Sequence, residues 1–565
     1  MASRQSVRQK IPVVRYGIDS DISDDESELS DEDASDNSVN SGDEDSADSE
    51  SLDENPHTLE NNNDGWECVQ PVDNCEETKF DFVGEQMLHV VPQSTEEFID
   101  LFLPESLISE LCAWTNSRAL IEKSRRQMNS EDDFQWNDVD VPTMKKFLGL
   151  TILMGIVKKP TIRSYWSTDS LLATPYFSHP SSLSRDRYLA ILRFLRFSNP
   201  YNAEENRPQT RLKDFLDEVK TICSVFRPGQ SLAVDESLLL FKGRLSFKIF
   251  IRTKRSRFGV KLFILTTDAG YFISCVVYTG SSTDYTCTEP GCENLSKSEL
   301  VVVALLSEAN LLDQGYIVNI DNWYNSIRLV HYLQQRNTGV RGTVRKNRGI
   351  PECLQNTKLL PVKSAYFKKN NVIAIKFVDK QDVYFLTSAD SASEVEKQRR
   401  KPGGQSVTIK KPTAIERYNK EMGGIDVEDQ LITTYNCVRK AHCWFKKVGF
   451  NIIMRLLLNG FILDKHRGTQ KVDFLMFLKK AVQHLTSIPS TQRTQSGRKR
   501  IILEELQTNP PHSLERIPST DKKLNPTKRC RLCFRKGHRK ESRYQCSVCE
   551  ERPGLCIGCF QEYHA

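Results

Sequence analysis

Three aspartates stand within an expected strand, at the end of another and at the expected start of a helix. Asp235 lies within the apolar run SLAVDESLLLF, Asp321 ends the run YIVNID, and Asp426 follows a Gly-Gly pair at the expected start of a helix. Asp429 comes three residues later, on the same face of that helix. A carboxylate in a buried strand either pairs with a positive neighbour or binds a metal ion, because an unpaired buried charge is too costly to keep.

Carboxylates on a central strand, at a neighbouring strand's end and on a packing helix can form an oxygen cage for two Mg²⁺ ions. Two such ions, roughly 4 Å apart, stabilise the attacking and the leaving oxygen of a phosphodiester. The placement of Asp235, Asp321 and Asp426 therefore predicts metal-dependent chemistry on nucleic acid. A salt-bridged strand carboxylate is the alternative for Asp235.

The C-terminal segment offers a second set of metal ligands. Three CxxC pairs are accompanied by two histidines: Cys530 and Cys533, Cys546 and Cys549, Cys556 and Cys559, with His538 and His564. Eight ligands suffice for two tetrahedral Zn²⁺ ions. So short a segment has little core, so metal is expected to supply its folding free energy. The other cysteines are scattered, which argues against a disulfide scaffold and for a reducing compartment.

The elements that must position the aspartates follow from hydrophobic patterns. Residues 94–226 have mostly helical patterns. From residue 231 onward, SFKIFIRT, VKLFILTT and YFISCVVYTG are typical of strands, 298–312 of a helix, and 315–324 of a further short strand. Strands, a helix and a returning strand are the order of an RNase-H-like α/β domain.

The charge of the chain is divided. The formal net charge of +4 includes an acidic segment, residues 19–54, with 17 Asp and Glu and no Lys or Arg, which leaves 78 basic against 57 acidic residues elsewhere. The basic remainder suits a polyanionic partner. The acidic segment is too polar to form a core and is predicted to be disordered, either as a solubilising tail or as a regulatory one. No apolar run is long enough to span a membrane.

Basic residues cluster beside the strand that carries Asp235. The segment KIFIRTKRSRFGVK contains Lys248, Arg252, Lys254, Arg255, Arg257 and Lys261. These side chains either present phosphates with a positive surface or protect a solvated strand edge. Residues 491–526 are polar and Pro-containing and are expected to form a linker, in which Arg498-Lys499-Arg500 is a candidate nuclear import signal.

Six sequence motifs occur in an order that is specific enough to indicate a protein family. The chain contains VDESLLLFKGR, RTKRSRFGVKLF, NIDNWYNS, RGTVRKNRGIPECL, YNKEMGGIDVEDQL and RKAHCWFKK in succession. With the upstream FLGLTILMGIVKKPTIRSYWSTDSLLATPYF, this chain closely resembles piggyBac-type transposases, from about residue 94 to the C-terminus.

The resemblance implies a multidomain α/β protein. After the acidic tail (1–93), which its composition predicts to be disordered, the expected parts are a mostly helical dimerisation and DNA-binding domain (94–230 and 437–490) and an RNase-H-like catalytic domain (231–345 and 412–436) with an insertion domain (346–411). A cross-brace zinc-binding cysteine-rich domain (527–565) is expected at the C-terminus. Within the insertion, NVIAIKFV and DVYFLTS predict a hairpin.

The resemblance also implies a reaction and its residues. Members cut transposon ends, pass through hairpinned ends and join them at TTAA sites, with catalytic aspartates that match Asp235, Asp321 and Asp426 and a further essential one that matches Asp429. Arg345 and Arg348 match positions that contact DNA, and the basic side chains at 252–257 would join them. Trp444 matches a functional tryptophan, which either stacks on a base or packs beside the site. Partners would be a second copy of the chain and nuclear DNA.

Two other classes fit part of the sequence. A domesticated descendant would keep the fold and DNA binding without cutting, although intact carboxylates weigh against lost chemistry. A RING-like ubiquitin-ligase module would explain the cysteines and leave the aspartates unexplained.

Overall fold

A computed structural model describes residues 65–71, 80–84, 87–88, 92–128, 135–201, 207–251, 258–283, 285, 287–400, 406–437, 443–467, 473–488 and 512–564. The chain divides into two compact units, 1–489 and 490–565. Within the described residues, no helix combines the length and the apolar character that a membrane crossing requires. The predicted acidic tail at 19–54 and the basic side chains at 252–257 lie outside the described residues.

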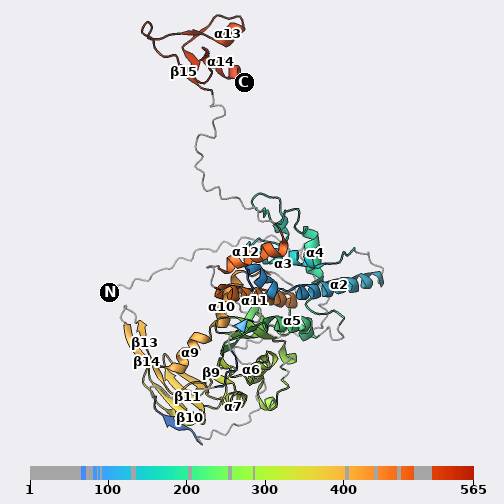
Figure 1. The fold of residues 1–565 in the computed structure, drawn as a ribbon, viewed down its shortest axis with the longest axis vertical. Helices are drawn as coiled ribbons and strands as arrows, with labels where there is room; N and C mark the ends of the chain where they lie inside the picture. Colours follow the sequence, from blue (N-terminus) through green and yellow to red (C-terminus); the bar gives the residue numbers. More distant parts are fainter. Residues whose placement is uncertain are drawn as a thin grey trace, which may run out of the picture. The chain divides into compact units, whose positions relative to one another are not determined.

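A mixed sheet forms the centre of the first unit. Ten of the described strands join in the order β1-β10-β11-β12-β9-β8-β4-β6-β5, and β7 pairs with β6 (Figure 1). The strands are β1 (Glu67–Val69), β4 (Ser231–Leu240), β5 (Ile249–Phe250), β6 (Phe258–Thr267), β7 (Phe272–Val277), β8 (Ile317–Ile320), β9 (Gly339–Thr343), β10 (Ser364–Lys369), β11 (Val372–Val378) and β12 (Asp382–Thr387). β4 pairs antiparallel with β6 and parallel with β8, and β8 pairs parallel with β9.

The predicted strands around Asp235 are confirmed, and so is the hairpin in the insertion. β11 and β12 pair antiparallel, with Ile375 opposite Phe385. Their sheet is continuous with that of β4, because Phe385 on β12 also pairs with Thr343 on β9. A second hairpin, β13 (Glu394–Arg400) with β14 (Ser406–Pro412), leads into α9 (Thr413–Glu421) and α10 (Gly424–Thr434).

Helices cover the sheet and form a second layer. The first group comprises α1 (Thr95–Phe102), α2 (Glu105–Met128), α3 (Val141–Ile156), α4 (Arg185–Phe194) and α5 (Lys213–Cys223). It packs with α11 (Trp444–His466) and α12 (Phe474–Thr486), which come from far along the chain. Figure 1 shows α11 beside α10 and α12. Leu456 and Leu457 of α11 are completely buried, so this helix is the core of the layer.

Crossover helices complete the unit. They are α6 (Lys297–Glu308), α7 (Ile327–Gln335) and the short α8 (Glu352–Asn356). A capping box explains where α6 begins, because the Ser296 side chain and the Glu299 side chain each satisfy a backbone N–H of the first turn. α6 links the antiparallel strands to β8 and thereby brings the strand ending at Ile320 back beside β4.

The prediction of a disordered tail over 1–93 is wrong for part of that range. β1 pairs with β10, and β2 (Met87–Leu88) pairs with β3 (Phe226–Arg227). Phe82 packs edge to face on Tyr316, with ring centroids 5.0 Å apart. Apolar residues such as Val69 and Phe82 explain the difference, because they can bury surface that the acidic residues before them cannot.

Candidate metal centres

Asp235 and Asp321 are neighbours across two parallel strands. Val234 pairs with Ile320, so the next residue of each strand is an aspartate. The backbone N–H of Glu236 donates to Asp235 at 2.8 Å. The hydroxyl of Thr343, from the third parallel strand, donates to Asp321 at 2.9 Å. Both aspartates are half-buried, so solvent can reach them.

The start of α10 lies over the same face of the sheet. Side chains two residues apart on a strand share a face, so Asp235 and Ser237 point to the same side of β4. Ser237 donates a 2.8 Å hydrogen bond to Asp429 of α10, which fixes the helix on that side. Asp426, in the first turn of α10, is exposed and lies three residues before Asp429, on the same helix face.

A glycine allows this helix to approach the sheet. A Cβ on Gly424 would lie 2.4 Å from the carbonyl oxygen of Thr267, the last residue of β6. Only glycine permits so close a contact, and the contact sets where α10 starts. The sequence predicted a helix start near Asp426, which the structure confirms at Gly424.

Tyr418 of α9 lies close to both strand carboxylates, and the sequence analysis missed it. Burial raises the pKa of Tyr418, and so do the nearby carboxylates of Asp321 and Asp235. A hydrogen bond with Thr343 lowers this pKa but does not cancel the increase. The phenol therefore stays protonated at neutral pH. Its position in YNKEMGGID, eight residues before Asp426, is the signal that could have found it.

The donor set suits Mg²⁺ in its chemistry. Carboxylate oxygens are the ligands that this ion prefers. The arginines on the neighbouring elements pair with other carboxylates, Arg341 with Asp390 and Arg455 with Asp429. In the described part of the chain, two groups of side chains have all their metal-ligand atoms within 4.8 Å of one another, and both groups lie in the second unit. The three aspartates are therefore farther apart than the ligands of those groups.

The second unit contains two clusters of four metal-ligand side chains. One consists of Cys530, Cys533, Cys556 and Cys559, and the other of His512, Cys546, Cys549 and His564. Ligands of the two clusters alternate along the chain in a cross-brace. The elements that hold them are β15 (Leu514–Arg516), β16 (Lys528–Arg529), α13 (Arg531–Arg535), β17 (Glu541–Ser542), β18 (Tyr544–Cys546) and α14 (Ile557–His564).

The sulfur distances fit tetrahedral zinc. Zn–S bonds of about 2.3 Å at tetrahedral angles place sulfur atoms about 3.8 Å apart. The Sγ of Cys556 lies 3.8 Å from those of Cys530 and Cys533, and the Sγ of Cys533 lies 3.5 Å from that of Cys559. In the other cluster, Nδ1 of His512 lies 3.3 Å from Sγ of Cys546. Both clusters therefore have the dimensions of a four-coordinate site.

One thiol in each cluster has a lowered pKa, Cys530 in the first and Cys546 in the second. Burial raises the pKa of Cys530, but hydrogen bonds from the backbone N–H groups of Cys533 and Cys556 outweigh burial and lower it to about 7. The thiolate is the form that binds metal.

Comparison with known proteins identifies the family. The family described as "Transposase IS4" matches residues 95–461, and the family described as "DDE_Tnp_1-like zinc finger" matches residues 507–565. The human "PiggyBac transposable element-derived protein 3" is 24% identical over 490 residues, which are 84% of this chain and 77% of that protein. The chain belongs to the piggyBac transposase family.

Two further similarities are consistent with this family. The human "PiggyBac transposable element-derived protein 2" is 23% identical over 393 residues, which are 67% of this chain and 63% of that protein. A piggyBac transposase in a synaptic complex with hairpin DNA, solved by cryo-electron microscopy, has a TM-score of 0.58 and 24% identity, covering 84% of this chain and 98% of that one. The piggyBac transposase fold is therefore shared.

In this piggyBac-family chain, one predicted zinc ligand is replaced by another. The prediction named His538, but the structure places that side chain outside both clusters and exposed, and His512 takes its place. The ring of His512 stacks on that of His564, with centroids 4.1 Å apart. His512 was assigned to the linker 491–526, yet β15 beside it pairs with β18, so the unit begins earlier than predicted. No spacing rule signalled it, because His512 lies 18 residues before the first CxxC pair.

Asp429, predicted to be catalytic, is held differently from the other three aspartates. Its carboxylate lies 2.6 Å from the guanidinium of Arg455, which is fully buried in α11. Glu428 lies 2.5 Å from the same guanidinium. Burial raises the pKa of Glu428 to about 7, although Arg455 opposes the shift. Asp429 thus joins α10 to α11 and β4, and the sequence analysis missed both Glu428 and Arg455.

The predicted DNA-binding residues lie in different places. Arg345 is exposed, and its Nε donates to Asn322, the residue after Asp321, at 3.3 Å. Arg348 instead reaches the hydroxyl of Ser298 in α6 at 3.2 Å. Trp444 begins α11 half-buried, edge to face with Phe247 at 5.1 Å. The structure thus places Arg345 beside Asn322, the residue that follows Asp321. Arg252, Lys254, Arg255 and Arg257 lie outside the described residues.

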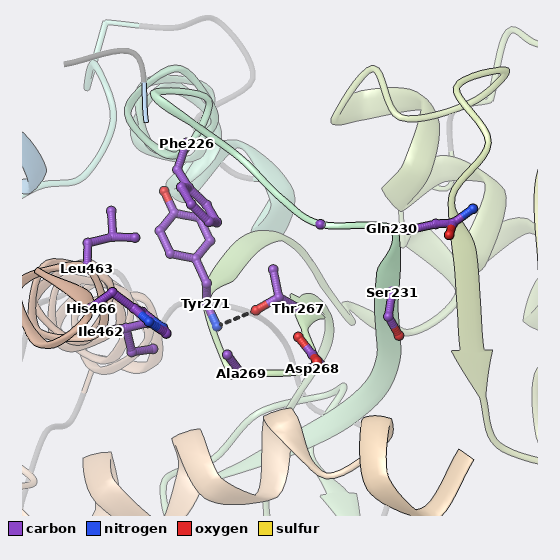
Figure 2. A pocket seen from close by; sticks show the side chains of 11 residues that line it. Phe226, Gln230, Ser231, Thr267, Asp268, Ala269, Tyr271, Ile462, Leu463 and His466 are labelled. Carbon is purple, nitrogen blue, oxygen red and sulfur yellow. Dashed lines mark hydrogen bonds between the residues drawn. The ribbon is translucent and has the colours of Figure 1, made fainter. Parts of the chain in front are cut away.

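A separate pocket of about 230 Å³ lies at the opposite end of β4 from Leu240 (Figure 2). It is lined by Ser231, Thr267, Tyr271 and His466 among others, and the N–H of Tyr271 donates to the Thr267 hydroxyl at 3.1 Å. None of the four aspartates lines it, so this pocket is distinct from the candidate metal centre.

Proposed function

We propose that this protein is a DNA transposase that cuts transposon ends and joins them to TTAA target DNA by metal-dependent hydrolysis and transesterification. The observation that carries the proposal is the pairing of Val234 with Ile320, which makes Asp235 and Asp321 neighbours on the face that α10 covers. Family membership supports the same reaction class.

The sheet supports an RNase-H-like catalytic domain. In such a domain a central strand pairs antiparallel on one side and parallel on the other, and β4 does so with β6 and β8. The strands of the insertion extend this sheet beyond β9. The catalytic side chains then come from β4, from the end of β8 and from α10.

Each acidic residue has a role in this proposal. Asp235, Asp321 and Asp426 would hold two Mg²⁺ ions, which would supply charge stabilisation for the attacking and leaving oxygens of a phosphodiester. Thr343 orients the carboxylate of Asp321 through their hydrogen bond. Asp429, paired with Arg455, keeps α10 on the sheet. Arg345, exposed beside Asn322, is available for a DNA phosphate.

The second unit would bind two structural Zn²⁺ ions and DNA. Its family match and its two four-ligand clusters support zinc. Basic side chains surround the clusters, and the guanidinium of Arg529 lies 4.7 Å from the ring centroid of Phe534. A metal-held frame with exposed arginines suits the phosphates of a transposon end.

The same function requires a place and a partner. Chromosomal DNA is the substrate, so the protein would act in the nucleus. Two transposon ends must be held together, which a homodimer would provide. The helical layer formed by α1–α5, α11 and α12 is the proposed dimerisation and DNA-binding part, because it carries Trp444 next to the catalytic sheet.

The test is cleavage of DNA that carries inverted repeats bounded by TTAA from either side of the coding region. The full-length chain should nick the ends in Mg²⁺. Asp321→Asn removes the charge that binds the cation and should lower the cleavage rate by at least about a hundredfold, while DNA affinity stays unchanged. Asp313→Asn, an aspartate 53% exposed and paired with Arg336, is the matched control and should cut normally. Normal cutting by Asp321→Asn would refute the assignment.

A second candidate is a domesticated DNA- or chromatin-binding protein without cutting activity. The names of the two human relatives describe them as derived from a transposable element, which favours this alternative. Tight, Mg²⁺-independent binding of the same DNA by the wild-type chain, with no strand cleavage, would establish it.

A further inference from the structure

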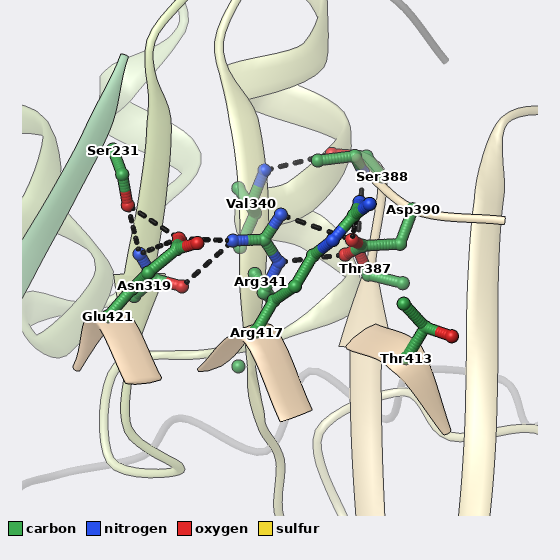
Figure 3. Close-up of polar contacts among 12 residues, drawn as sticks. Ser231, Asn319, Val340, Arg341, Thr387, Ser388, Asp390, Thr413, Arg417 and Glu421 are labelled. Carbon is green, nitrogen blue, oxygen red and sulfur yellow. Dashed lines mark hydrogen bonds and ion pairs between the residues drawn. The ribbon is translucent and has the colours of Figure 1, made fainter. Parts of the chain in front are cut away.

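A buried charge cluster lies at the start of β4, where Ser231 contacts Glu421 (Figure 3). Its centre is Arg341 of β9, whose side chain is 4% exposed. On one side its guanidinium binds Asp390 through two contacts, of 2.8 and 3.1 Å. On the other side it lies 2.6 Å from Glu421, the last residue of α9. Figure 3 shows Arg341 bridging these two carboxylates.

Glu421 connects α9 to three strands. Its Oε2 accepts from Ser231 of β4 at 2.6 Å, from Asn319 of β8 at 3.4 Å and from Arg341 of β9 at 2.6 Å. The same three strands, further along the same face, carry Asp235, Asp321 and Thr343. The three partners of Glu421 therefore form one row across these strands, and Asp235, Asp321 and Thr343 form a second row beside it.

The position of Glu421 links this row to Asp426. After Glu421 the chain turns through Met422 and Gly423 and begins α10 at Gly424, with Asp426 in the first turn. Gly424 is fixed against Thr267 from the β6 side. The turn that leads into the first turn of α10 is thus anchored at Glu421 before it and at Gly424 after it.

The cluster contributes more to the position of α9 on the sheet than to the stability of the fold. A carboxylate at a helix C-terminus is unfavourable because it faces the negative end of the helix dipole, so Glu421 does not stabilise α9 locally. Buried ion pairs generally add little stability over well-packed apolar residues, and their best-attested role is to specify one arrangement. Asp390 is fully buried and also binds Arg417 of α9 at 3.1 Å, so the same helix is held one turn earlier as well.

We propose that the Arg341–Glu421 pair positions the first turn of α10, and with it Asp426, relative to Asp235 and Asp321. Arg341 and Glu421 act in this proposal as positioning residues, through their contacts with each other and with Asp390, Ser231 and Asn319. The inference rests on the proposed function for the identity of the site.

The test compares one substitution that keeps the size of the side chain and one that keeps its charge with a matched control. Glu421→Gln keeps the size of the side chain and removes its charge, and Arg341→Lys keeps the charge and removes the bridging fork. Arg336→Lys is the control, because Arg336 also bridges two carboxylates, Asp313 at 2.7 Å and Glu289 at 2.8 Å, at the end of α7. All variants are full-length chains, and circular dichroism reports their folding.

Two measurements decide the outcome. Amide hydrogen exchange of residues 422–429 should be about tenfold faster in Glu421→Gln and Arg341→Lys, since a hydrogen bond between charged groups is lost, and unchanged in Arg336→Lys. Affinity for Mn²⁺, followed by electron paramagnetic resonance, should fall about tenfold in the same two variants. Saturating Mn²⁺ should restore their DNA cleavage, which a general loss of structure would not allow.

The failures are distinguishable. Unchanged exchange at 422–429 in Glu421→Gln would overturn the positioning role, and so would faster exchange with wild-type Mn²⁺ affinity. If Glu421→Gln does not fold, Ser231→Ala removes one of the three contacts of Glu421 and should give a smaller change in the same direction. A wild-type chain that binds no Mn²⁺ would instead overturn the proposed function, while hydrogen exchange would still decide whether the pair holds α10.

Discussion

The guanidinium of Arg455 lies 2.6 Å from the carboxylate of Asp429 and 2.5 Å from that of Glu428. One fully buried cation thus serves two successive acidic residues of α10. It also donates to Ser237 of β4 at 3.1 Å, so three elements meet at a single side chain. The position of α10 over the sheet depends on this contact as well as on Glu421.

Replacement of Arg455 should destabilise the fold strongly. Arg455→Met keeps much of the volume but leaves Glu428 buried without its cation, and removal of one partner of a buried pair costs about 3–5 kcal/mol. Urea unfolding of the first unit would measure the loss. Arg336→Met, in which a partly exposed arginine is removed, should cost about 1 kcal/mol or less. Equal losses in the two variants would show that Arg455 has no special structural role.

Glu428 should make stability depend on pH. Its pKa in the folded state is raised from an ordinary 4.5 to about 7, so the folded state binds the proton more tightly than the unfolded state does. The resulting stabilisation is complete below about pH 4.5 and is lost as the pH rises through about 7. The melting temperature of the wild type should therefore fall between pH 5 and 8 more steeply than that of Glu428→Gln. Parallel curves would contradict this.

His512 should be needed for the second metal, and His538 should not. His512→Ala removes one of four ligands and should lower the zinc content of the full-length chain from about two ions towards one, or weaken the second ion strongly. His538→Ala changes an exposed side chain and should retain both ions. Zinc is measured by mass spectrometry under native conditions. Loss of zinc in His538→Ala alone would restore the original ligand assignment.

The acidic segment should restrain DNA binding. Residues 19–54 carry 17 Asp and Glu without a basic residue, and they can compete with DNA for basic surfaces elsewhere in the chain. Deletion of residues 1–55 should tighten non-specific DNA binding at low salt. The difference should fade as salt rises, because exposed charges are screened over about 8 Å at physiological ionic strength. Fluorescence anisotropy with a short duplex measures both, and equal affinities at low salt would exclude the effect.

Local sequence patterns predicted much of the fold. Alternating and continuous apolar runs located β4, β6, β7, β8 and α6, and the Gly-Gly pair located the start of α10. These patterns work because backbone periodicity and the absence of a side chain act within a few residues. The same reasoning placed Asp235, Asp321 and Asp426 on elements that the sheet then brings to one face.

Contacts between distant residues were not predictable in this way. Arg341 and Glu421 are 80 residues apart, and Ser231 and Glu421 are 190 apart. Arg455 reaches Ser237 across 218 residues. Each contact requires a specific packing of α9, α10 or α11 on the sheet, and the charge of a residue alone does not say which opposite charge it will meet.

The sequence by itself predicted the types of chemistry, with carboxylates for divalent cations and cysteine pairs for zinc, and it contains the order of motifs that identifies the family. It could do so because ligand preference and CxxC spacing are properties of the residues and of the local chain. Tertiary structure decided the rest. In the folded chain His512, and not His538, joins a ligand cluster, and the ligands of the two clusters alternate in a cross-brace. Asp429 pairs with Arg455. These contacts depend on which surfaces become close neighbours when the chain packs.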